Sequence, residues 1–273
     1  HAVLNGIPLP SASKLIGEFR AVVFSPAHLS LVKEGPVQRR RFLDLALSQL
    51  RPRYASLLSQ YNRALAQRNI LLKDIAYHSE LMDTLAIWDE RLAMLGAQII
   101  YQRRSYVDRM QESAVAFYHG LSRGREELSL AYASSIEGRS AEEIAYELSE
   151  KLTKNRAEDL KNGSTSVGPH RDDLEIYVDQ LSARIYGSQG QQRSCALSMK
   201  LSEAALIREI TGEQPVALLD DVMSELDAGR QDYILNHIEG WQVFITCCEP
   251  SSLLRLCDGK TFSLHSGSLE ETA

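Results

Sequence analysis

The sequence lacks any apolar run of the roughly 18–20 residues that a membrane-spanning helix needs. Residues 1–6 also lack the basic and then apolar plan of a secretion signal. Because the chain starts with His1 rather than Met, we expect the true N-terminus to lie elsewhere. The 273 residues are 44% hydrophobic and 24% charged, which is typical of a globular protein with one large or two modest cores. These features predict a cytoplasmic protein with no membrane partner.

Cysteine is scarce, and its four positions show no spacing typical of metal ligands. Cys247 and Cys248 are adjacent, which suits neither a disulfide framework nor a zinc site, while Cys195 and Cys257 stand alone. This usage favours a reducing compartment. We expect Cys247 and Cys248 to be small core residues at the end of a strand rather than reactive thiols.

Acidic residues outnumber basic ones, and the net charge of −6 by itself argues against nucleic acid as a partner. The distribution argues the other way, because residues 36–69 contain seven arginines and a single acid, Asp44. Such an asymmetry indicates a specialised surface. A charge run is often only the solvated face of a helix, and some of these arginines could instead pair with acids of residues 126–159. The candidate contacts to DNA phosphates are Arg39, Arg40, Arg41, Arg51 and Arg53.

Hydrophobic periodicity predicts a helical middle for the chain. Residues 20–24 are typical of a short buried strand, and helical spacing then runs over residues 36–69 with a break at Pro52. Residues 79–133 contain few glycines and no proline, so we expect long helices there. Together these helices predict an antiparallel arm.

Strands return in the last third of the sequence. A capping box over Ser140–Glu143 opens one more helix, to about Leu160, and the composition changes at residues 161–166. The later elements that we expect are a hairpin of residues 174–178 and 182–186, a helix over 191–210, and strands at 216–219, 243–246 and 261–264. The predicted fold is therefore an α/β layer interrupted by a helical insert.

Two adjacent carboxylates, Asp220 and Asp221, follow the apolar strand at residues 216–219. The carboxyl end of such a strand is where open α/β sheets bind ligands. Carboxylate oxygens suit Mg²⁺, and a second carboxylate can orient an attacking water for phosphoryl transfer. A buried strand followed by a solvated acidic turn is the structural alternative, which the sequence Ser-Glu-Leu-Asp at residues 224–227 makes less attractive.

A glycine-containing loop, residues 186–194, precedes the helix predicted at 191–210. Gly187 and Gly190 permit a close approach of the backbone, and Ser188 offers a hydroxyl. The free amides and the dipole of a helix start favour an anion. An ordinary loop before a helix would look the same when taken alone.

Together, and in this order, the two motifs resemble those of ABC-type ATPases. Ser188-Gln189-Gly190-Gln191 is similar to the Ser-Gly-Gly-Gln signature core, Leu219-Asp220-Asp221 to Walker B, and residues 224–227 to the D-loop. Within that superfamily the chain looks most like the RecF family. The segments that carry this resemblance are residues 24–26, 35–36, 39–44, 67–69, 168–173, 188–193 and 218–227.

The resemblance implies an ABC-type head that binds ATP and Mg²⁺ and hydrolyses ATP slowly. Asp220 is then the metal ligand, and Asp221 is the catalytic residue that polarises water. The implied nucleotide-binding residues are Ser188, Gln189, Gly190, Gln191, Asp227 and Thr246. Thr246 stands where the superfamily usually has a switch histidine, so which group senses the γ-phosphate stays open.

The P-loop of the RecF family lies near the N-terminus, before any residue present here. The only Gly-Lys-Thr, residues 259–261, is a decoy, because position 254 is Leu and a strand follows. We therefore expect this chain alone neither to bind ATP tightly nor to hydrolyse it. The divisions that we predict are a remnant of the N-terminal ATPase lobe (1–35), a helical arm (36–163) and the C-terminal part of the head (164–273).

The resemblance also implies a DNA-repair role. The implied partners are double-stranded DNA at gap junctions, the RecO and RecR mediators, and a second copy in an ATP-dependent, head-to-head homodimer. A non-catalytic helical module that binds DNA or protein is the alternative from another class, and another SMC-like ATPase or a transporter head is the alternative within the superfamily. His170 and Arg171 could reach nucleotide or transmit movement, or could belong to a structured turn.

Overall fold

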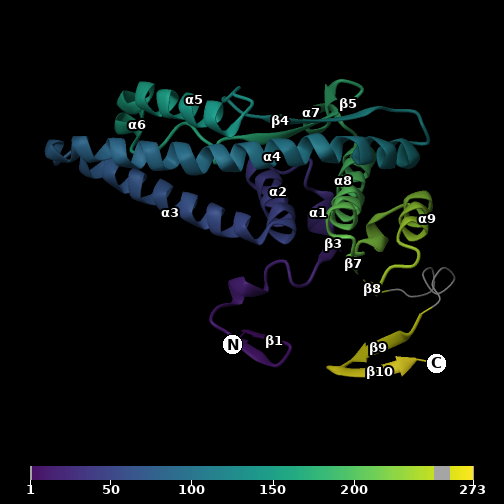
Figure 1. The fold of residues 1–273 in the computed structure, drawn as a ribbon. Coiled ribbons are helices and arrows are strands. Elements are labelled where there is room, and N and C mark those ends of the chain that lie inside the picture. The colour runs from purple at the N-terminus through teal and green to yellow at the C-terminus, as the bar shows by residue number, and fades with distance from the viewer. Residues whose placement is uncertain (1, 249–258, 273) are drawn as a thin grey trace.

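The computed structural model describes residues 2–248 and 259–272. Figure 1 shows a long helical arm above a small parallel sheet, with a hairpin at each end of the chain. The helices are α1 (Pro26–Leu29), α2 (Pro36–Leu50), α3 (Pro52–Asp74), α4 (Leu85–Ser122), α5 (Ala141–Lys154), α6 (Arg156–Asn162), α7 (Ala183–Tyr186), α8 (Gln189–Thr211) and α9 (Ala228–His237). The strands are β1 (Ala2–Leu4), β2 (Ile7–Leu9), β3 (Ala21–Phe24), β4 (Leu128–Ala133), β5 (Asp173–Val178), β6 (Leu181–Ser182), β7 (Val216–Asp220), β8 (Val243–Thr246), β9 (Thr261–His265) and β10 (Ser268–Thr272).

The parallel sheet has the strand order β3-β7-β8 and confirms three strands that the sequence predicts. The side chains of Val22, Phe24, Ala217 and Leu219 are fully buried in it, as expected for short apolar strands that other elements cover. All three strands run the same way, so their carboxyl ends meet at one edge. This register places the last residue of β7 beside the last residue of β8.

The arm is built from α2, α3 and α4, with α5 and α6 packed against it (Figure 1). The predicted break at Pro52 is confirmed, because α2 ends at Leu50 and Pro52 occupies the first turn of α3. α4 has 38 residues and is therefore about 57 Å long. It runs from the tip of the arm, where it meets α3, to the side of the molecule that carries α9 (Figure 1).

A second, antiparallel sheet with the order β4-β5-β6 covers the arm. Its first strand corrects the sequence-based prediction, since residues 128–133 are a strand and not the end of the helical run. They form a strand because Leu128 to Ala133 pair with Val178 to Asp173 of β5, a partner distant in the sequence. The predicted hairpin is also shorter than expected, because residues 183–186 form the helical turn α7.

α8 is the central helix, and every residue from Ser194 to Ala204 is buried. One side of it, with Cys195 and Met199, joins the core of the arm. The other side, with Leu197 and Leu201, joins the core of the parallel sheet. A helix enclosed on all sides shows little amphipathic pattern, and α8 is thus the element that connects the two cores.

The remaining predictions have mixed outcomes. The capping box of Ser140 is confirmed, but the helix that it opens is two helices that meet at Asn155. The adjacent Cys247 and Cys248 are exposed, so the expectation that they are core residues is wrong. Cys257 and the decoy position 254 lie outside the described residues. No helix in the described part of the chain is long and apolar enough to cross a membrane.

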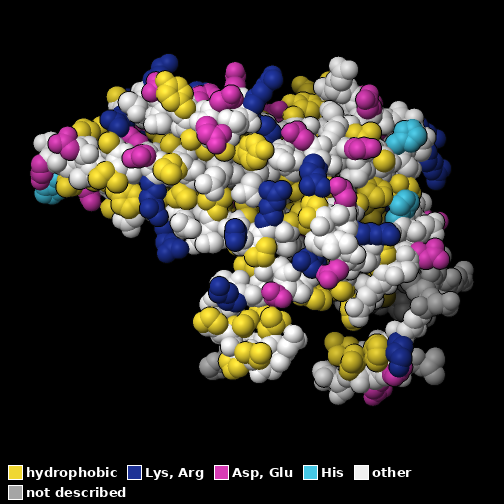
Figure 2. All heavy atoms as spheres, viewed as in Figure 1, with side chains coloured by type: hydrophobic (Ala, Val, Ile, Leu, Met, Phe, Trp, Pro, Cys, Tyr) yellow, Lys and Arg dark blue, Asp and Glu magenta, His cyan; other side chains and the backbone are white. Residues whose placement is uncertain are grey.

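The two terminal hairpins, β1-β2 and β9-β10, carry exposed apolar side chains, which form yellow clusters in Figure 2. These side chains belong to Val3, Ile7, Phe262, Leu264 and Leu269. The predicted strand at residues 261–264 is confirmed as β9, and it pairs with β10 rather than with the parallel sheet.

Candidate functional site

The carboxyl edge of the parallel sheet brings together three of the predicted site residues. Thr246 at the end of β8 donates a hydrogen bond from its hydroxyl to Asp220 Oδ1, at 2.8 Å. The same hydroxyl accepts a hydrogen bond from the backbone amide of Asp221, at 3.0 Å. All three residues are exposed. Thr246 therefore fixes the spacing of the two acids, and both carboxylates stay open to solvent.

Asp221 has a left-handed backbone conformation, with φ of 48°. Asp and Asn are among the few residues other than glycine that adopt this region readily. The Ser224 hydroxyl lies 2.9 Å from the carbonyl of Asp221 and 3.2 Å from its Oδ1. The Ser224 hydroxyl thus contacts both the backbone and the carboxylate of Asp221 in the turn after β7.

The loop before α8 ends in a capping box. Ser188 Oγ accepts a hydrogen bond from the Gln191 amide at 3.2 Å, and Gln191 Oε1 accepts one from the Ser188 amide at 2.7 Å. The other end of the Gln191 side chain donates to Glu126 Oε1, at 2.9 Å. Local sequence therefore sets the start of α8, and Glu126 connects it to the chain that leaves the arm.

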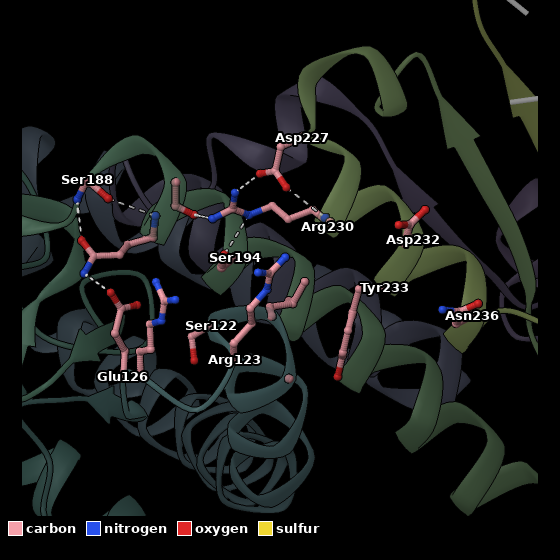
Figure 3. A pocket seen from close by; sticks show the side chains of 16 residues that line it. Ser122, Arg123, Glu126, Ser188, Ser194, Asp227, Arg230, Asp232, Tyr233 and Asn236 are labelled. Atoms are coloured by element: carbon pink, nitrogen blue, oxygen red, sulfur yellow. Dashed lines mark hydrogen bonds and ion pairs between the residues drawn. The ribbon is translucent and has the colours of Figure 1, made fainter. Parts of the chain in front are cut away.

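Arg230 joins the loop before α8 to the start of α9 (Figure 3). Its guanidinium donates to Gly190 O at 2.9 Å and to Ser194 Oγ at 3.0 Å, and it forms an ion pair with Asp227. Asp227 also caps α9 by accepting from the Arg230 amide. Burial opposes ionisation of Asp227, but these hydrogen bonds and the charge of Arg230 outweigh it and lower the pKa of Asp227.

A pocket of about 510 Å³ lies between the start of α8, the start of α9 and the end of α4 (Figure 3). It is lined by four of the predicted site residues, namely Ser188, Gly190, Gln191 and Asp227. Gln189 is exposed and does not line it. Asp220, Asp221 and Thr246 do not line it either. The structure therefore divides the predicted nucleotide-binding residues into two groups.

Sequence reasoning missed several residues of this pocket, chiefly Arg123, Arg125, Arg230 and Tyr233. The Arg-Gly-Arg of residues 123–125 follows a long helix and resembles an ordinary helix end. Arg230 lies only three residues after Asp227, and this short spacing is the feature of the sequence that could have indicated an ion pair between them.

The arginine-rich segment is less uniform than its composition indicates. Arg39 is buried and forms a two-armed ion pair with Asp173, with N–O distances of 2.8 and 2.7 Å. The prediction that Arg39 contacts DNA phosphates is therefore corrected, because its charge is already neutralised inside the protein. Arg40 is half-buried and donates to Asp172 O at 2.6 Å.

Arg41, Arg51 and Arg53 are exposed. On the face seen in Figure 2, Lys and Arg side chains alternate with hydrophobic ones along the arm and do not form one continuous basic patch. These three arginines, with the half-buried Arg40, remain the candidate phosphate contacts.

Residues 168–173 form a hydrogen-bonded turn, which is one of the two alternatives left open by the sequence. His170 Nε2 and the Arg171 guanidinium both donate to Thr165 O, and Tyr61 donates to His170 Nδ1 at 2.7 Å. Burial lowers the pKa of His170 to about 4, so the ring is neutral at physiological pH. Neither side chain lines the pocket at the start of α8.

Comparison with curated proteins finds similar proteins that share one name. No family model matches it. Three similar curated proteins are called "DNA replication and repair protein RecF". They come from Agathobacter rectalis (48% identity; 89% of this chain and 66% of the relative), Acetivibrio thermocellus (43%; 90% and 68%) and Clostridium perfringens (40%; 98% and 73%). The chain thus spans about two thirds of the length of the curated relatives it matches.

Two solved structures are also similar to the chain. They are described as the recombination mediator protein RecF-ATPrS and RecF-ATP in the RecFOR pathway. Both are 41% identical to the chain, and each comparison covers 98% of this chain and 72% of the other. The TM-scores are 0.91 and 0.90.

Proposed function

The chain belongs to the RecF family and has the α/β fold of an ABC-type ATPase head with an inserted helical arm, and from this premise we propose that it acts in an ATP-dependent recombination mediator. The protein binds DNA at single-strand gaps and helps to load recombinase through RecO and RecR. ATP drives two copies together head to head. The three divisions proposed are the lobe remnant (1–35), the arm (36–163) and the C-terminal part of the head (164–273).

The chemistry of the sheet edge fits a nucleotide–metal complex. Two exposed carboxylates stand at the end of β7, and the Thr246 hydroxyl stands beside them. Oxygen donors of this kind suit Mg²⁺, which when bound would neutralise phosphate charge. Asp220 would hold the metal, Asp221 would orient and polarise the attacking water, and Thr246 would keep the two carboxylates in place.

The strongest support for a site shared between two copies comes from one observation. The loop before α8 and Asp227 line one pocket, whereas the two acids and Thr246 gather at the sheet edge and do not reach that pocket. A single head arranged in this way leaves the two groups of residues on separate surfaces. A second copy, facing the first, would bring the pocket of one to the nucleotide of the other.

Ser188→Arg tests this arrangement. In the full-length protein the substitution should abolish ATP-driven dimerisation, because a long cation would fill the space that the partner's nucleotide needs, while each monomer still binds ATP. Light scattering with and without ATP measures the first effect, and calorimetry measures the second.

Ser140→Arg is the matched control, because Ser140 caps α5 with the same capping box and does not line the pocket. Either substitution should cost about 1 kcal/mol of stability through the lost cap. Dimerisation of Ser188→Arg at the wild-type level would overturn the shared site.

We expect the exposed arginines of the arm to bind DNA through phosphates. Replacing Arg41, Arg51 and Arg53 by Ala should weaken binding to all DNA sequences. The slope of log K against log salt should fall by about 0.9 for each lost contact with duplex phosphates. Fluorescence anisotropy over a salt series measures both effects.

Arg39→Met is the contrasting variant for that experiment. Arg39 is buried with Asp173, so its loss should lower the thermal stability and leave the salt slope unchanged. An unchanged affinity and slope in the triple variant would remove the arm from the DNA-binding proposal.

A further inference from the structure

The end of α4 places two unpaired cations at the pocket before α8. Arg123 and Arg125 line that pocket and are exposed. Within residues 2–248 and 259–272, neither guanidinium has a hydrogen bond or an ion pair. Of the neighbouring acids, Asp227 is paired with Arg230, and Glu126 accepts from Gln191 and from Tyr118. Two positive charges are therefore left over.

The backbone holds Arg123 at an unusual position. Arg123 caps α4 in the left-handed region, with φ of 56°, and the next residue, Gly124, is also left-handed. Glycine is the residue that favours such a helix end, and a side chain there costs of the order of 1 kcal/mol. A strained residue is typical of a place where the side chain has a use other than stability.

Arg123 extends between the two motifs that form the pocket (Figure 3). A Cβ on Gly229 would lie 3.2 Å from Arg123 Nη2 and 3.4 Å from Asp227 Oδ1. Because Gly229 has no side chain, the Arg123 guanidinium has room to lie above the start of α9. Ser188 and Gly190 line the same pocket from the side of α8.

We propose that Arg123 and Arg125 form a phosphate-binding subsite, which takes the polyphosphate of the nucleotide held by a second copy of this chain. The inference rests on the proposed function, because it needs two facing copies. Each guanidinium can donate two parallel hydrogen bonds to phosphate oxygens. The positive charges of Arg123 and Arg125 would also offset the repulsion between a polyphosphate and the carboxylates of Asp227, Asp232 and Glu126. The pocket shared with Ser188 favours nucleotide over the other source of phosphate, the DNA backbone.

With this subsite, α4 begins at the tip of the arm and ends at the proposed phosphate-binding residues. Leu85 begins the helix at the tip of the arm, and Arg123 follows it directly at the pocket. A single helix thus connects the arm, where we propose that DNA binds, with the phosphates of the partner's nucleotide.

The test uses the full-length protein with Arg123→Gly and Arg125→Ala combined. Glycine suits the left-handed backbone, so the double variant should keep or raise the melting temperature while it loses both guanidinium groups. We expect the Kd of the ATP-driven dimer to rise by about tenfold or more, because hydrogen bonds between charged groups are lost. ATP binding by the monomer should not change, and Arg123→Lys should recover part of the dimerisation.

Arg91→Ala is the control, because Arg91 is exposed on the same helix, near the tip of the arm. Duplex DNA binding without nucleotide is measured for every variant. If the double variant dimerises as the wild type does, the subsite is overturned, whether or not DNA binding falls. A fall in DNA binding alone would assign the two arginines to the DNA backbone. If the wild type does not dimerise with ATP, or Ser188→Arg has no effect, the proposed function fails instead.

Discussion

Asp221→Asn in the full-length protein is expected to keep ATP binding and to lower ATP turnover by about two orders of magnitude or more. A positioned general base contributes about 10²–10⁴-fold to a rate, and an amide cannot polarise water as a carboxylate does. Asp220 keeps its hydrogen bond from Thr246, so the proposed metal ligand is not disturbed. Steady-state phosphate release and calorimetry with ATP and Mg²⁺ measure the two quantities.

Asparagine is the right replacement because of the backbone. Asp221 is left-handed, with φ of 48°, and Asn tolerates this region as well as Asp does, whereas Ala does not. The variant therefore removes the charge and keeps the turn. Ser224→Ala is the control, because it removes only the hydroxyl that contacts Asp221, and turnover should fall far less. Wild-type turnover in Asp221→Asn would show that another group activates the water.

Arg68→Met is expected to have the largest effect on stability, a loss of about 3–5 kcal/mol. Arg68 is fully buried and joins α3 to Asp89 of α4 at 2.6 Å and to Asp159 of α6 at 2.7 Å. The substitution would leave two buried carboxylates without their shared cation. Asp89 would keep its ion pair with Arg156, but the Asp159 carboxylate would keep, among the described residues, only the hydrogen bond from the Ser166 amide. The arm should therefore loosen first where α6 meets α3.

The stability of the arm can be measured separately from that of the sheet. Thermal unfolding gives the overall loss, and hydrogen exchange of α3 and α6 gives the local one. Arg63→Met is the matched control, because Arg63 lies on the same helix, is exposed and, in the part of the chain that the structure describes, forms side-chain hydrogen bonds with Ser59 alone. Its effect should stay within about 0.5 kcal/mol. Equal effects of the two substitutions would mean that the buried network does not hold the arm together.

The same buried network explains the structural role of residues 67–69, which the sequence analysis identifies only through the family resemblance. Residues 67–69 match the RecF pattern, and the structure shows their physical use. Arg68 pairs with the two acids, and Asn69 Oδ1 accepts hydrogen bonds from the amide and the hydroxyl of Thr165, at 2.8 and 2.7 Å. Composition alone counts the seven arginines of residues 36–69 as one basic segment, although Arg39 and Arg68 are buried.

Local patterns determined much of this protein directly from the sequence. The short apolar strand before Asp221, the capped start of α8 at Ser188 and the break at Pro52 each depend on a few neighbouring residues. Strand and helix periods, caps and prolines act over short distances, so one sequence is enough to recognise them. The family resemblance rests on these same local segments.

Only the tertiary structure decided which charges are free and which residues meet. Arg39 and Arg41 stand two positions apart on one helix, yet one is buried against Asp173 and the other is exposed. Strand β4 formed because β5 was available as a partner, and Arg123 lies beside Gly229 because α4 ends next to α9. Burial, ion pairing and pocket formation depend on contacts between distant segments, and the periodicity of a single segment does not contain that information.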